Sequence, residues 1–179
     1  MVLRKEMSKM IKKIMLVILA LATIWFIGDI NLKGSSVYYA KHSSSSNVRD
    51  LELMMFTENL DILGKKDGFK YKHKIQEEKS VQNVEKNVYF GYSMHDDEQI
   101  YIYMDSDDKD YYFNVNFKLL KIVDFGNNMQ HIDISTIDEN KIKEEIYENF
   151  KPILEELENN EPDINLQWIF NWVYRDRIK

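Results

Sequence analysis

Apolar and polar positions divide the chain into one uninterrupted apolar run near the N-terminus and a longer part in which apolar residues recur periodically. Residues 14–28 (IMLVILALATIWFIG) carry no charge, and no second apolar run of comparable length follows them. At about 1.5 Å per residue this run spans roughly 22 Å, and it approaches the thickness of a bilayer when Met10 and Ile11 extend it. The pattern predicts one helix that inserts into a membrane.

The charges around this run predict its orientation. Residues 1–28 contain five basic residues and one acidic residue, whereas the rest of the chain contains 19 basic and 29 acidic residues. A basic lead before a single apolar stretch places the N-terminus inside and the following chain outside. Ala20-Leu21-Ala22 resembles a signal cleavage site, but the apolar residues 23–27 would then form the new terminus. We therefore expect residues 1–30 to be a retained single-pass cell-membrane anchor, with cleavage of the signal and secretion as the alternative.

The composition changes after the anchor. Residues 31–47 contain four consecutive serines at positions 43–46, and such a segment is typical of a flexible linker. Residues 48–179 suit one extracytoplasmic domain, and since the chain has no cysteine this domain folds without disulfides. Ser46 or Asn47 can cap a helix over residues 48–60. The inward positions of that helix would be Leu51, Met54, Met55 and Leu60.

Short segments rich in aromatic and branched residues follow, separated by polar turns, and they read as strands. They cover residues 69–75, 88–94, 99–104, 111–117, 119–125 and 130–135. Their close spacing leaves no room for crossover helices, so we expect an antiparallel meander. Lysines at alternate positions of the first segment are typical of an edge strand.

Two patterns predict the C-terminal elements. Thr136 and Glu139 form a possible capping box that opens a helix with Ile142, Ile146 and Phe150 inward, and Pro152 would kink this helix or start a second one. Large apolar residues alternate along residues 164–174, which favours a last strand. The predicted fold class is α+β: an antiparallel meander of about six to seven strands with an N-terminal helix and a C-terminal helical segment, preceded by one transmembrane or signal helix.

Strand register predicts a polar aromatic face. A six-residue loop at 105–110 would pair Met104 with Tyr111 and Ile102 with Phe113, which brings the apolar sides of the two strands together. The opposite face would then present Tyr89, Tyr101, Tyr103, Tyr112, Asn114 and Asn116. This face is either a contact platform for a partner, since tyrosine combines a large ring with a polar tip, or a surface that a helix covers.

The charge pattern narrows the class of partner. An acidic domain argues against nucleic acid, which requires clustered basic residues. The negative charge either steers a basic partner to the domain or only keeps the domain soluble. The loop that begins with Asp105, Asp107 and Asp108 faintly resembles a calcium loop, but it lacks the glycine and the glutamate that such loops use. We interpret these three aspartates as solvated turn residues that border the partner-binding face.

No residue set points to catalysis. The four histidines are far apart in sequence, and the chain contains neither an H-E-x-x-H nor a G-x-S-x-G motif. None of the six glycines stands in a phosphate-binding pattern. We therefore expect no catalytic residue, no metal site and no cofactor, and we expect that the protein is not an enzyme.

The whole organisation resembles the TipC family of immunity proteins. The resemblance rests on the basic start, the single membrane segment, the polar spacer, the segment YYFNVNF at 111–117 and the ending INLQWIFNW at 164–172. It implies an extracytoplasmic protein of a Gram-positive bacterium that binds and neutralises a secreted antibacterial toxin delivered by a type VII system. The implied toxin degrades a lipid-linked cell-wall precursor. The alternative is an exported structural or sensory protein of the cell envelope.

Overall fold

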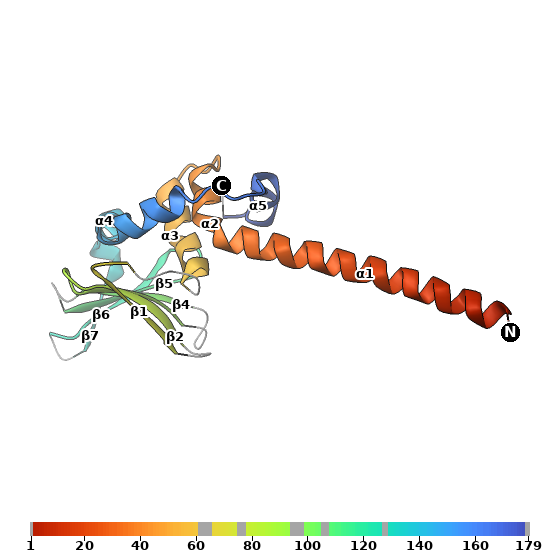
Figure 1. Ribbon diagram of the computed structural model, residues 1–179. Helices are drawn as coiled ribbons and strands as arrows, with labels where there is room; N and C mark the ends of the chain where they lie inside the picture. The colour runs from red at the N-terminus through yellow and green to blue at the C-terminus, as the bar shows by residue number, and fades with distance from the viewer. Residues whose placement is uncertain are drawn as a thin grey trace.

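The computed structural model describes residues 2–60, 66–74, 78–93, 99–104, 108–126 and 129–177. A long helix, α1 (Val2–Gly34), projects from a folded domain in which helices lie against one face of a sheet (Figure 1). The segment Met10–Gly34 of α1 is apolar, with a mean hydropathy of 2.2, and its most apolar part is not buried by the rest of the chain. In the described residues this is the one helix that is long and apolar enough to cross a membrane or to act as a signal.

The sheet has seven strands that follow one another in chain order, each antiparallel to its neighbours. The strands are β1 (Phe69–Lys74), β2 (Glu78–Asn83), β3 (Val88–Ser93), β4 (Gln99–Met104), β5 (Lys109–Phe113), β6 (Leu119–Asp124) and β7 (Gln130–Ile132). The predicted α+β class and the antiparallel meander are confirmed, and the lysine-rich β1 lies at an edge. Sequence reasoning missed β2, because Val81 is its one apolar residue.

The helix layer contains α2 (Ser36–Lys41), α3 (Val48–Asn59), α4 (Glu139–Glu158) and α5 (Gln167–Val173), and a short 3-10 helix, η2 (Ile134–Thr136), precedes α4. The helix predicted at 48–60 is confirmed as α3, capped by the Asn47 side chain. Its predicted inward residues are all buried: Leu51, Met54, Met55 and Leu60. The helix α4 runs through Pro152 as one element, and its N-cap is Asp138, whose side chain accepts from the amides of Asn140 and Lys141.

The prediction of a flexible linker at residues 31–47 is wrong for residues 31–41, which belong to the helices α1 and α2 or join them. Helix α1 continues to Gly34, and α2 buries Val37, Tyr39 and Ala40. Ser36, within the predicted linker, has a structural role, because its Oγ donates to the Met55 carbonyl at 3.2 Å and accepts from Asn59 Nδ2 at 2.6 Å. The apolar helix α1 therefore joins the folded domain without a flexible spacer.

The strand predicted at residues 164–174 is also wrong, because residues 167–173 form the helix α5. Positions 168 and 172, which alternation placed on one side of a strand, are also four residues apart and share one side of a helix. Only Phe170 of this helix is buried. The strand predicted at residues 130–135 is shorter than expected. It ends at Ile132, and the 3-10 helix η2 begins at Ile134, with Asp133 as its N-cap.

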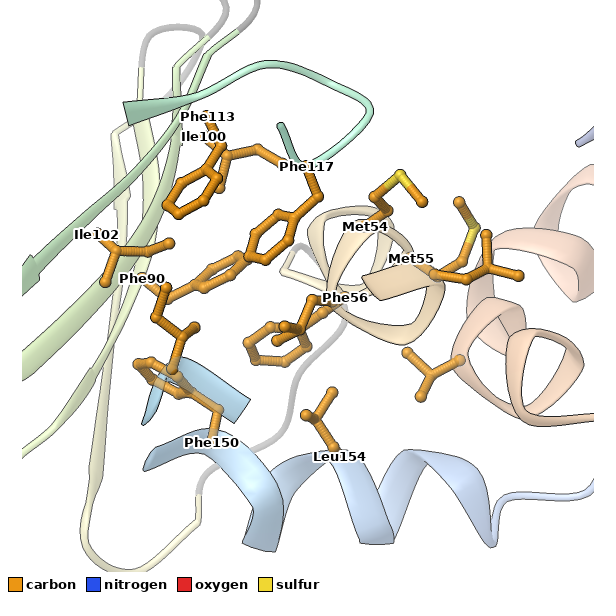
Figure 2. Close-up of a cluster of buried hydrophobic side chains, with 14 of the residues drawn as sticks. Met54, Met55, Phe56, Phe90, Ile100, Ile102, Phe113, Phe117, Phe150 and Leu154 are labelled. Carbon is orange, nitrogen blue, oxygen red and sulfur yellow. The ribbon is translucent and has the colours of Figure 1, made fainter. Parts of the chain in front are cut away.

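The core lies between the sheet and the helices α3 and α4 (Figure 2). The Phe56 ring of α3 and the Phe150 ring of α4 approach Phe90 of β3, with ring centroids 5.0 and 5.6 Å apart. At the end of β5, the rings of Phe113 and Phe117 stack at 4.5 Å. This aromatic packing covers the inner face of the sheet and leaves the alternate residues of the same strands on the other side.

Candidate tyrosine-lined binding face

The outer face of the sheet lies on the side away from α3 and α4 (Figure 1). The strand register places two rows of residues across it. One row contains Lys72, Ser80, Gly91, Tyr101, Tyr112 and Lys121. The second row contains Lys70, Gln82, Tyr89, Tyr103, Asp110, Val123 and His131. We call the centre of this surface, formed by Tyr89, Tyr101, Tyr103, Asp110 and Tyr112, the tyrosine face.

The observed register differs from the predicted one by two residues between β4 and β5. Ile102 lies opposite Tyr111 and Ile100 lies opposite Phe113. Side chains along a strand alternate with a period of two, so a two-residue shift leaves every side chain on the face predicted for it. The prediction that the four tyrosines share one face is therefore confirmed although the predicted pairs are wrong.

Gly91 determines how Tyr101 lies. A Cβ atom at Gly91 would stand 2.1 Å from Tyr101 Cζ, so the tyrosine ring lies directly over the glycine backbone of the neighbouring strand. A glycine inside a strand often marks such a close approach. The ring of Tyr101 is thereby laid across the sheet instead of standing away from it.

The two other central tyrosines form a pair across β3 and β4. Tyr89 and Tyr103 lie opposite each other, and their ring centroids are 5.8 Å apart with planes inclined by 52°. Both are half-buried. Each ring shields the other from water on one side and presents its remaining surface outward.

Tyr112 connects this face to charged groups. Its hydroxyl donates to Asp110 Oδ2 at 3.0 Å, and Lys121 Nζ lies 4.2 Å from the ring centroid. Burial, followed by the charge of Asp110, raises the pKa of Tyr112 to about 12. Burial also raises the pKa of Asp110, against the opposing effect of the Tyr112 hydrogen bond. Tyr112 is therefore a neutral hydrogen-bonding group at physiological pH and not an activated nucleophile.

The tyrosine face, apart from Tyr112, borders an open hollow of about 540 Å³ on the outer side of the sheet. Its lining consists of Lys72, Ser80, Tyr89, Tyr101, Tyr103, Asp110 and Phe125. The lining carries both an ammonium group and a carboxyl group around an aromatic floor. Within the described ranges no helix lies over this surface (Figure 1). For these residues, the alternative in which a helix covers the tyrosines is therefore wrong.

Asn114 and Asn116 do not belong to the tyrosine face, and their prediction is corrected. Strand β5 ends at Phe113, and Asn114 Oδ1 accepts from the amides of Asn116 and Lys118 at 2.9 and 3.0 Å. Phe117, with a φ of 55°, then turns its ring into the core. The two asparagines lie in the β5–β6 turn, which the Asn114 side-chain oxygen closes by accepting from the backbone N–H of Asn116 and of Lys118.

The acidic loop is only partly described. Asp105 and Asp107 lie outside the described residues. Asp108 is exposed at the start of β5 with a φ of 52°, and its carbonyl accepts from the Phe125 amide at 2.9 Å. It lies in a turn beside the hollow and does not line it. Among the residues with described positions, no group of three His, Cys, Asp or Glu side chains is placed to hold a metal ion.

Sequence reasoning missed several residues of the hollow. Asp110 precedes the predicted strand by one residue and shares the outward parity of Tyr112, so continuing the alternation by one position would have included it. Ser80 could not be found without β2, which carries almost no apolar signal. Phe125 was placed at the end of a predicted strand, and it borders the hollow from the turn that follows β6.

A second group of charges lies within the helix layer. Lys41 Nζ is 3.6 Å from Glu52 Oε1 and 3.2 Å from Glu158 Oε2, and the Tyr147 hydroxyl donates to Glu158 at 3.2 Å. Burial, followed by repulsion from Glu158, raises the pKa of Glu52 to about 7. Nearby, Lys143 Nζ lies 2.6 Å from Asp50 Oδ2 and joins α4 to α3. These groups connect the helices α2, α3 and α4, whereas the tyrosine face is formed by the strands β3, β4 and β5.

No model of a protein family, no curated protein and no solved structure matches this chain.

Proposed function

We propose that this protein is a membrane-anchored immunity protein whose domain outside the cell binds and neutralises a secreted antibacterial toxin. In this proposal the tyrosine face is the toxin-binding surface, and the protein is a binding module without catalytic activity. The proposal follows the resemblance to the TipC family. The observation that carries the proposal is the open hollow on the outer face of the sheet. Aromatic rings form its base, and a lysine and an aspartate lie at its border.

The chemistry of this face supports protein binding. Tyrosine contributes a large rigid ring and a hydroxyl at low entropic cost, and aromatic residues are enriched where proteins contact one another. Because Tyr101 lies flat over Gly91, the floor of the hollow is already formed before a partner arrives. A preformed surface lowers the ordering cost of binding. The acidic character of the chain, with a net charge of −6, would steer a basic toxin towards it.

The structure of α1 supports a retained anchor over a cleaved signal. Tyr39 Oη lies 2.6 Å from Asn31 Oδ1, and Leu32 packs against the domain core. Cleavage after Ala22 would leave an exposed apolar helix stub, in which Trp25 is 73% exposed, still attached to the domain. With the basic residues before α1, we propose that the N-terminus is inside and the domain outside.

The function can be tested in the bacterium that carries the gene. We expect a deletion strain to lose viability in co-culture with its parent, and to recover when the wild-type gene is restored. A gene with Tyr101→Ala and Tyr103→Ala should not restore survival. The matched control is His131→Ala, which changes the same outer row at β7, outside the lining of the hollow.

Three results would contradict the proposal. Equal survival of the deletion strain and its parent would remove the immunity role and favour the alternative of a structural or sensory envelope protein. Full protection by the double tyrosine variant, when the cells contain as much of it as of the wild-type protein, would show that the toxin binds another surface. Protease added to intact cells should digest the domain, and resistance of the domain would contradict the proposed orientation.

A further inference from the structure

The helix α5 carries large aromatic side chains that the domain does not bury. Trp168 is 72% exposed and Trp172 is 67% exposed, and the two lie one helical turn apart on the same side. Val173 at the end of α5 and Ile164 just before it are also half exposed or more. Phe170 points the other way and is fully buried. The helix is therefore held by one aromatic residue and presents two tryptophans outward.

Hydrogen bonds tie this segment to the end of the apolar helix α1. Tyr39 Oη lies 2.6 Å from Asn31 Oδ1 and 3.0 Å from the Ile164 carbonyl oxygen, and it accepts from the Leu166 amide at 3.1 Å. Gln167 Nε2 donates to the Tyr39 carbonyl at 2.9 Å, and the Phe170 ring lies 5.5 Å from the Tyr39 ring. Because Tyr39 contacts both segments, α5 cannot move independently of α1.

This connection sets the level of α5 relative to a bilayer. Asn31 comes three residues after Gly28, the last residue of the uncharged run. At a rise of about 1.5 Å per residue, Asn31 stands about 5 Å beyond the end of that run. The polar headgroup layer on each side of a bilayer is of similar thickness, roughly 5–8 Å. Figure 1 shows α5 on the side of the domain from which α1 leaves, with the sheet on the far side.

We propose that α5 is a second membrane contact, which inserts Trp168 and Trp172 into the headgroup layer of the bilayer that α1 spans. Tryptophan is enriched at this level of membrane proteins because its ring is apolar and its N–H is polar. Arg175 and Arg177 come two and four residues after the end of α5, with Asp176 between them, whose Oδ2 lies 3.9 Å from Arg175 Nε; the Arg175 side chain is 65% exposed. Two cations beside the tryptophans suit anionic phospholipid headgroups, although the rest of the domain is acidic.

The consequence is a fixed orientation of the domain. One helix alone would let the domain rotate about its axis, whereas a second contact beside it restricts that rotation. The sheet would then stay on the side of the domain away from the lipid, with the tyrosine face accessible to a soluble partner. This inference rests on the proposed retention of α1 in the membrane, and the experiment separates the two.

Tryptophan fluorescence of the full chain tests the inference. The chain has three tryptophans, so Trp25→Phe leaves Trp168 and Trp172 as the only reporters. The protein is reconstituted into vesicles of phosphatidylcholine and phosphatidylglycerol, with or without bromine on the acyl carbons nearest the headgroup. We expect blue-shifted emission and about a twofold or greater loss of intensity in the brominated vesicles, because bromine quenches a ring in contact with it.

A matched variant reports the opposite side of the domain. Trp25, Trp168 and Trp172 are changed to Phe, and Met129→Trp places a single reporter at a position that is 67% exposed beside β7. We expect its emission to stay at the wavelength of a water-exposed ring and to be equally intense in both kinds of vesicle.

Vesicle flotation distinguishes the possible failures. Protein that floats with vesicles while Trp168 and Trp172 remain unquenched overturns this inference and leaves the anchor intact. Protein that does not float overturns the anchor and this inference together. Equal quenching of the Met129→Trp reporter also overturns the proposed orientation. A loss of protection on changing both tryptophans to Ser, without any lipid quenching, would assign α5 to a protein partner instead.

Discussion

The two faces of the sheet are built from the same strands and nearly the same rings, yet they differ in chemistry. On β3 and β4, Phe90 and Ile102 point inward and are fully buried, whereas Tyr89 and Tyr103 point outward and are half-buried. A phenylalanine ring has no polar atom and is stable only away from water, while a tyrosine hydroxyl can remain in water above a buried ring. The outer face is therefore a partly exposed aromatic surface and not an extension of the core.

Phe90→Ala should have the largest effect on stability. Phe90 contacts Phe56 and Phe150 at the centre of the core, and its removal leaves a cavity, so we expect a loss of about 3–5 kcal/mol in the free energy of unfolding. Urea unfolding of the domain measures it. The neighbouring Tyr89→Ala is the control from the opposite face, and an equal loss there would end the distinction between the two faces.

Glu52→Gln tests whether water is excluded from Glu52 in the helix layer that covers the inner face of the sheet. The pKa of Glu52 is about 7 in the folded protein and 4.5 ordinarily, so the folded state binds more protons than the unfolded state between these values. The contribution of Glu52 to the free energy of unfolding is therefore fully present below about pH 4.5 and is lost as the pH rises to about 7. We expect Glu52→Gln to raise the free energy of unfolding by about 1–3 kcal/mol at about pH 8 and much less at about pH 5.

Urea unfolding at the two pH values measures this change. The control is Glu144→Gln on the exposed side of α4, which should leave the pH dependence as it is in the wild-type protein. An unchanged pH dependence in Glu52→Gln would mean that water reaches Glu52 in the folded protein.

Tyr103→Ala should separate binding from stability. The ring lies against Tyr89 on an open face, so we expect a loss of less than about 1 kcal/mol in the free energy of unfolding. If the tyrosine face binds the toxin, the same change should weaken that complex by about 1–3 kcal/mol, as measured by calorimetry. A stability loss of about 3–5 kcal/mol would instead make Tyr103 a core residue.

Tyr112→Phe should have the smallest effect. It removes the hydrogen bond to Asp110 and keeps the ring, so we expect a stability loss of about 0.5–1 kcal/mol. The pKa of Asp110, already raised by burial, should rise further because its donor is lost. Carbon NMR of the Asp110 carboxyl group measures this shift, and an unchanged pKa would show that the hydrogen bond does not stabilise the carboxylate.

Several parts of the fold could be predicted because the local pattern and the tertiary environment agree. The helix α3 combines a capping asparagine with four correctly predicted core positions. The tyrosines could be assigned to one face because alternation has a period of two and survives a register shift of two. β2 could not be predicted, because its pairing partners and not its own composition hold it in the sheet.

The candidate site was predictable in part for the same reason. The rings of the tyrosine face follow from alternation along β3, β4 and β5. The assignment of Asn114 and Asn116 failed because a strand was extended past Phe113, where side-chain hydrogen bonds to the backbone make a turn. Such bonds compete with strand pairing, and residue order alone does not show which of the two prevails.

The order of residues alone was enough to predict the one helix apolar enough to cross a membrane, the antiparallel class and the shared side of the sheet for the four tyrosines. These features depend on hydrophobicity and on repeats of two or about four residues, which neighbouring positions express directly. The three-dimensional contacts were needed to establish that α2 buries Val37, Tyr39 and Ala40, that residues 167–173 form a helix, and that Tyr101 lies over Gly91 at the base of the hollow. Those outcomes depend on contacts between segments far apart in the chain, whose free energies exceed local preferences.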